Sequence, residues 1–208
     1  HIYKREPSFP IAVACDPAFN FVYEANIRYL HHLGEVTYFS PLADTSLPDA
    51  GFVYLPGGYP ELYLAALSAN RQMLQSIRRY VESGGKLLAE CGGMMYLCDE
   101  IRDKNGDVYP MAGVLHQSAT MENMKLRLGY RTLLYNETRL KGHEFHYSRL
   151  VEQQNPLPSC AVAYTAKGVE TDTPLYHYKN VWAGYTHLYW ADPVGNEWFT
   201  KFVIDGNT

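Results

Sequence analysis

The chain has 208 residues, of which 19% are charged and 14% aromatic, and its formal net charge is −4. This composition is typical of a globular domain with a sizeable core and excludes a disordered chain. The lack of a basic excess argues against nucleic acid as a partner, and no apolar run approaches the roughly 20 residues of a membrane span.

The four cysteines are scattered without a C-x-x-C pair, at positions 15, 91, 98 and 160. Such usage is typical of a reducing compartment, so we expect a cytoplasmic protein. Because the chain begins at His1, we interpret it as a piece of a longer protein. Residues 1–10, which hold two prolines, are predicted to be a linker or lead-in, and residues 11–208 one domain.

The first half of the chain alternates short apolar runs with helical patterns. This rhythm predicts an α/β fold with a mostly parallel sheet that is covered by helices on both faces, and active sites of such sheets lie at the carboxyl ends of the strands. The predicted strands are Ile11–Cys15, Glu35–Phe39, Gly51–Leu55 and Leu87–Glu90; the predicted helices run from Phe19 to Leu33 and from an N-cap at Asn70 to Gly84.

Two of these strands run into glycine pairs. The turn Pro56-Gly57-Gly58-Tyr59-Pro60-Glu61 follows the third strand. Such turns leave backbone N–H groups free to bind an oxyanion. The alternative is an ordinary loop between a strand and a helix. Cys91 and Gly92-Gly93 follow the fourth strand, in the pattern of a sharp strand-to-helix turn that presents a nucleophile. A helix N-terminus at this point favours the thiolate, although a buried structural cysteine is the alternative.

The second half is predicted to be rich in β-strands. We expect a hairpin that turns at Lys179-Asn180 and a closing helix from Val194 to Ile204. The predicted β segments are Lys125–Tyr135, Gly142–Val151, Ala161–Thr165, Leu175–His177 and Val181–Tyr185.

A cysteine nucleophile needs a base, and the spacing of the histidines leaves His187 and His146 open as candidates. His143 shares a strand with His146 but lies on the opposite face. His116 and His177 are interpreted as structural, and no ligand pair with regular spacing indicates a metal site.

Several motifs, in this order, resemble the glutamine amidotransferase half of the cobyrinic acid a,c-diamide synthases. They are Leu55-Pro56-Gly57-Gly58-Tyr59-Pro60-Glu61, Ala89-Glu90-Cys91-Gly92-Gly93-Met94-Met95-Tyr96-Leu97, Gly142-His143-Glu144-Phe145-His146-Tyr147-Ser148 and Tyr185-Thr186-His187-Leu188. The resemblance covers the chain from about residue 10 onward.

The resemblance implies a flavodoxin-like, class I amidotransferase fold and an enzyme that makes ammonia from glutamine. It implies Cys91 as nucleophile, His187 as base, and Gly58 and Gly92 as oxyanion-hole donors, with His143 and His146 as near-site candidates. The implied partners are glutamine, a synthetase domain of the same parent chain and, through that domain, cobyrinate; a homodimer stays open. ATP and Mg²⁺ are expected in the synthetase domain, since no GxxxxGK[ST] motif occurs here and this chain is expected to hold no cofactor.

Three positions depart from related amidotransferases. Tyr189 stands where a triad glutamate is common, Ala89 where glycine is common, and Met95 where a glutamine-contacting Gln is common. The orienting carboxylate and the substrate contacts therefore stay unassigned. Alternatives are the amidotransferase of cobyric acid synthase or of another tetrapyrrole a,c-diamide synthase, a cysteine hydrolase that does not use glutamine, and a module that has lost its chemistry.

Overall fold

The computed structural model describes residues 9–206, and its centre is a six-stranded sheet. Five strands run parallel and one edge strand, β13, is antiparallel. In spatial order the strands are β13 (Leu175–Tyr178), β14 (Val181–Gly184), β4 (Leu87–Glu90), β3 (Phe52–Leu55), β1 (Pro10–Ala14) and β2 (Glu35–Phe39).

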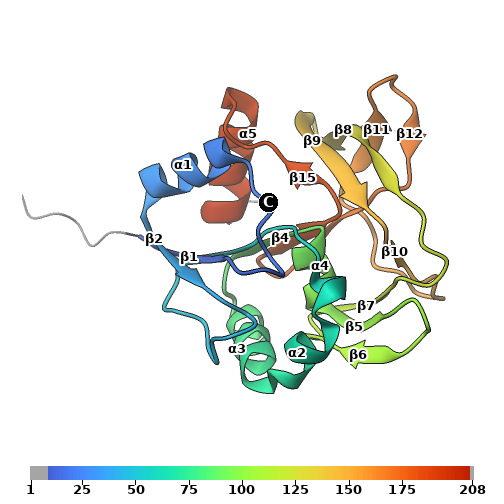
Figure 1. Cartoon of the computed structure of the whole chain (residues 1–208). Helices are drawn as coiled ribbons and strands as arrows, with labels where there is room; N and C mark the ends of the chain where they lie inside the picture. The colour runs from blue at the N-terminus through green and yellow to red at the C-terminus, as the bar shows by residue number, and fades with distance from the viewer. Residues whose placement is uncertain (1–8, 207–208) are drawn as a thin grey trace, which may run out of the picture.

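Two smaller sheets lie at one side of the central sheet (Figure 1). The first has the order β10 (Arg149–Leu150), β7 (Leu115–Thr120), β5 (Cys98–Arg102) and β6 (Val108–Pro110). The second has the order β12 (Glu170–Thr171), β11 (Val162–Thr165), β8 (Arg127–Tyr135), β9 (Thr138–His146) and β15 (His187–Leu188). The predicted segment Gly142–Val151 is thus two strands in two different sheets.

Helices cover both faces of the central sheet, with α1 and α5 on one side and α2 and α3 on the other (Figure 1). Alternate residues of β1 belong to the two separate hydrophobic cores on the two faces of the sheet. Ile11 and Val13 pack with the tryptophans on one face. Ala12 and Ala14 pack on the other face, under α2 and α3. The helices are α1 (Glu24–Leu33), η1 (Pro60–Leu62), α2 (Leu64–Ala69), α3 (Arg71–Glu82), α4 (Gly92–Leu97), α5 (Pro193–Trp198) and η2 (Phe199–Ile204). No helix among the described residues is long and apolar enough to cross a bilayer.

Local signals account for several of these elements. The Asn70 side chain caps α3 by accepting a hydrogen bond from the Met73 amide at 3.5 Å, and α3 buries an apolar stripe at helical spacing. The hairpin of β13 and β14 turns at Lys179, whose φ is +50°. Both features are confirmed as predicted from the sequence.

The predicted start of the first helix is wrong. α1 begins at Glu24 and not at Phe19, because the Phe21 amide donates to the carbonyl of Gly57 and holds the preceding segment as a loop. The closing helix is confirmed over the predicted span, as the α-helical segment α5 followed by the π-helical segment η2. Residues 1–8 of the predicted lead-in lie outside the described residues, and Pro10 already pairs with Glu35 in the sheet.

Candidate active site

Cys91 lies at the sharp turn between β4 and α4. Its backbone has φ +52° and ψ −108°, a conformation that costs an L-residue about 1–3 kcal/mol and that concentrates at functional sites. The preceding strand is fully buried, and the Cys91 amide donates to the carbonyl of Gly184 on the neighbouring strand. The predicted sharp turn between a strand and a helix is therefore present at Cys91.

This thiol lines a cavity of about 220 Å³ at the carboxyl ends of β3 and β4. The lining residues come from five separate parts of the sequence, which only the fold brings together. The lining residues are Phe21, Gly58, Tyr59, Cys91, His143, Phe145 and His187.

His187 reaches the cavity from β15, which pairs antiparallel with β9 so that His187 lies opposite His143. The two imidazoles are stacked, with ring centroids 4.9 Å apart, and Phe21 meets the His187 ring edge-on. Gly57 packs closely against the His187 ring. A Cβ at Gly57 would lie 2.2 Å from His187 Cε1. Glycine at this position is therefore required by the close approach of the imidazole.

Gly58 and Gly92 lie side by side next to the thiol. A Cβ on Gly92 would be 3.2 Å from the backbone nitrogen of Gly58, so the two backbones are in contact. Gly58 has φ +154°, which favours glycine, and it lines the cavity directly, whereas Gly92 is the first residue of α4. An oxyanion hole needs two neighbouring backbone amides of this kind.

Burial dominates the electrostatics of the pair. It raises the pKa of the Cys91 thiol well above its ordinary value, and the nearby Glu61 carboxylate raises that pKa further. The Gly92 amide acts in the opposite direction but does not outweigh burial, so the expected preference for thiolate is wrong for the free chain. Burial, with smaller contributions from His143 and His146, lowers the pKa of His187 to about 3. Both groups are therefore neutral at rest, and the Cys91 thiol donates to the Phe145 carbonyl at 3.6 Å.

The other candidate base faces a different cavity. His146 stacks on Tyr185 with centroids 3.7 Å apart, and its ring nitrogens lie 2.7 Å from Glu144 Oε2 and 2.8 Å from the Ser148 carbonyl oxygen. Burial opposes ionisation of Glu144, but hydrogen bonds from His146 and other donors lower its pKa to about 2. The predicted two faces of the strand are present: His143 shares the cavity of Cys91, and His146 lines a neighbouring one.

The other histidines among residues 9–206 lie outside this cavity. His177 stacks on Trp182, and His116 lies at the surface 3.3 Å from Asp99 Oδ1. His31 and His32 occupy the last turn of α1.

Glu90 supports the site from behind Cys91, and no sequence motif singles it out. Its carboxylate is 2% exposed and accepts hydrogen bonds from the Tyr54 hydroxyl and, at 2.8 Å, from the Leu188 amide. It therefore ties the strand that carries His187 to the strand that carries Cys91. The signal in the sequence is a carboxylate at the end of an apolar strand, where burial demands a partner.

The buried carboxyl group of Glu90 should make the free energy of unfolding depend on pH. Burial raises its pKa from 4.5 to about 7, so between these values the folded chain holds a proton that the unfolded chain has lost. Glu90 thus makes the free energy of unfolding fall as pH rises from 4.5 to 7, by about 3 kcal/mol in total. Urea unfolding of wild type and Glu90→Gln across this range should show that difference. A parallel pH dependence in both proteins would contradict the assignment.

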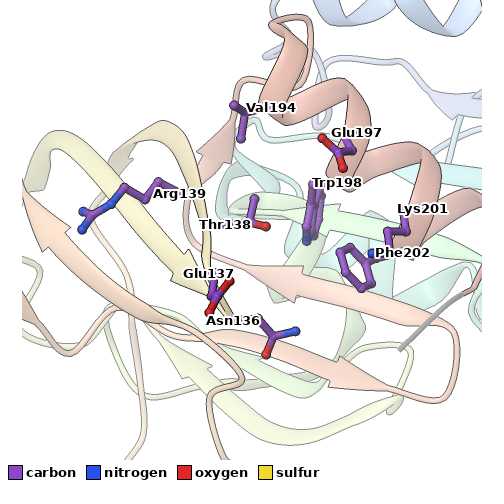
Figure 2. Close-up of a pocket in the computed structure, with 9 residues that line it drawn as sticks. All are labelled: Asn136, Glu137, Thr138, Arg139, Val194, Glu197, Trp198, Lys201 and Phe202. Atoms are coloured by element: carbon purple, nitrogen blue, oxygen red, sulfur yellow. The ribbon is translucent and has the colours of Figure 1, made fainter.

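A cavity of about 730 Å³ lies elsewhere, between the β8–β9 turn and the C-terminal helices. Figure 2 shows the Trp198 and Phe202 rings among its lining residues. None of the described residues that line it is a cysteine or a histidine, so it does not hold the thiol and the imidazole that the sequence motifs predict.

Two solved structures superpose on most of this chain. The PurLQS structure from Thermotoga maritima superposes with a TM-score of 0.58 at 18% identity and covers 86% of this chain and 87% of that one. A glutamine amidotransferase crystal structure has a TM-score of 0.58 at 16% identity, covering 93% of this chain and 98% of that one. The fold is that of class I glutamine amidotransferases, which confirms the predicted α/β architecture.

The family model for the CobB/CobQ-like glutamine amidotransferase domain matches residues 10–194, and the chain belongs to this family. It is 40% identical over 185 residues to hydrogenobyrinate a,c-diamide synthase of Pseudomonas aeruginosa, covering 86% of this chain and 41% of that protein. It is 40% identical over 188 residues to cobyrinate a,c-diamide synthase of Fusobacterium nucleatum, with the same two coverages. The chain thus spans less than half the length of these relatives.

Proposed function

We propose that this chain hydrolyses glutamine at Cys91 and supplies the ammonia for amidation of the a and c carboxylates of cobyrinate. The observation that carries the proposal is the single cavity that holds the Cys91 thiol, the His187 imidazole and the Gly58 backbone, in a chain of the amidotransferase family. The names of the relatives support a corrinoid a,c-diamide as the product of the longer protein.

In the proposed reaction the Cys91 sulfur attacks the side-chain carbonyl carbon of glutamine, while His187 takes the thiol proton. The developing oxyanion accepts hydrogen bonds from the Gly58 and Gly92 amides, and loss of one such donor costs roughly 3–4 kcal/mol of transition-state stabilisation. His187 then gives the proton to the departing amine, which leaves as ammonia. Water cleaves the glutamyl thioester, releasing glutamate and restoring the thiol.

The amidation step is proposed to take place in the part of the longer protein that this chain does not span. ATP and Mg²⁺ would activate the carboxylates there, and the ammonia would come from the cavity of Cys91. Assays of the full-length protein with cobyrinate and with metal-free hydrogenobyrinate would distinguish the two macrocycles that the relatives' names contain.

The test is labelling with 6-diazo-5-oxo-L-norleucine, an electrophile that mimics glutamine, followed by peptide mass spectrometry. We expect one adduct on Cys91 and none on the other three cysteines, together with release of ammonia from glutamine by the full-length protein. Turnover of peptides or simple esters without any turnover of glutamine would instead favour a cysteine hydrolase of another class.

A further inference from the structure

Glu61 is half-buried and has one carboxylate oxygen without a donor. Its Oε2 atom is buried, and none of the described residues gives it a hydrogen bond. Burial raises the pKa of Glu61, while a hydrogen bond from its own backbone amide lowers it. A buried carboxylate oxygen without a donor is costly and calls for a function, because buried polar groups in folded proteins are almost always paired.

The position of Glu61 connects it to the active site. It belongs to η1, which begins directly after Gly58 and Tyr59, two residues of the cavity wall. The adjacent Pro60 packs against the start of α4, since a Cβ on Gly92 would be 2.7 Å from Pro60 Cδ. The carboxylate is close enough to Cys91 to raise the pKa of the thiol. A carboxylate with one free oxygen therefore lies near the thiol.

A substrate with a positive charge near its reacting carbon would complete this arrangement. In glutamine, two methylene groups separate the amide carbon from the carbon that bears the α-ammonium. The position four residues after the nucleophile, where an amide side chain commonly contacts glutamine, is the apolar Met95 here, and it is buried. Met95 offers no acceptor for an ammonium group apart from a weak thioether sulfur.

We infer that Glu61 is the ammonium subsite of the glutamine pocket: its free carboxylate oxygen accepts a hydrogen bond from the α-ammonium of the substrate. The inference rests on the proposed function and adds to it the group that distinguishes an amino acid from a simple amide. The ammonium ion also neutralises the charge that opposes ionisation of Cys91. Substrate binding thereby makes proton transfer from the thiol to His187 easier.

The test compares L-glutamine with glutaramate, its analogue without the α-amino group, in the full-length protein. For Glu61→Gln we expect kcat/KM for glutamine to fall roughly 10- to 100-fold, mainly through KM, since a hydrogen bond between charged groups is lost. The value for glutaramate should change less than about 3-fold. An equal fall of kcat/KM for both substrates, which leaves the ratio of the two kcat/KM values unchanged, would overturn the inference.

A second measurement does not depend on turnover. Removing the Glu61 charge should speed alkylation of Cys91 by iodoacetamide, because the carboxylate no longer raises the thiol pKa. The matched control is Glu82→Gln, which removes an exposed carboxylate paired with Lys179 and should leave alkylation unchanged. Unchanged or slower alkylation in Glu61→Gln would assign the residue a purely structural role. Failure of wild type to hydrolyse glutamine would instead refute the proposed function itself.

Discussion

Replacing Cys91 by alanine is expected to abolish release of ammonia from glutamine, with a loss of about four orders of magnitude or more. No other described thiol lines the cavity, so no neighbour can replace the nucleophile. The substitution removes one sulfur atom and leaves the turn itself in place. The melting temperature should therefore shift by less than about 4 °C, since a change of 1 kcal/mol moves it by about 2–4 °C in a chain of this size.

The matched control is Cys98→Ala. Cys98 is as buried as Cys91 and its thiol donates to the Met94 carbonyl at the end of α4, but it lies outside the cavity. We expect this variant to lose some stability, because a buried group is deleted, and to keep glutaminase activity within about 3-fold. Full activity in Cys91→Ala would show that the chain is not a cysteine-dependent amidotransferase.

Replacing His187 by alanine is the second large effect, with an expected loss of roughly 10²- to 10⁴-fold in kcat for glutamine. The neutral thiol of the resting site needs a base, and His187 is uncharged above pH 4 because burial lowers its pKa to about 3. In wild type, activity should accordingly not decline between pH 7 and pH 5 through protonation of this base. Ammonia release measured over that range, with a buffer-independent assay, checks both expectations.

Two further histidine variants separate the base from its surroundings. His177→Gln alters a ring that also stacks on an aromatic side chain but lies outside the cavity, so activity should stay within about 3-fold. His143→Gln removes the imidazole that stacks on His187, and a smaller loss is expected than for His187→Ala. A loss as large in His143→Gln as in His187→Ala would transfer the role of base to His143.

The positions of Cys91 and His187 depend on contacts with residues that take no part in the proposed reaction. Glu90 joins the two strands that present the thiol and the imidazole, and Gly57 leaves room for the imidazole ring. Such supporting contacts matter because a displacement of about 1 Å in a reacting group can cost 10²-fold in rate.

Local patterns in the sequence were sufficient to predict the strands of the central sheet. Leu87–Glu90 is a strand as predicted, because four apolar or strand-end residues lie between glycine pairs. The turn at Cys91, the cap at Asn70 and the hairpin at Lys179 are also determined within a few residues, by positive φ angles or by a side chain that bonds its own helix. These features depend only on neighbours in the chain.

Only the tertiary structure decided which distant groups meet. Spacing alone could not say whether His187 or His146 shares a cavity with Cys91. The answer follows from the pairing of β15 with β9, which sets His187 against His143, while His146 lines another cavity. The same holds for β14, which reads as half of a hairpin and also joins β4 in the parallel sheet. Periodicity records which face of a strand is buried, but register between strands far apart in the sequence is set by long-range packing.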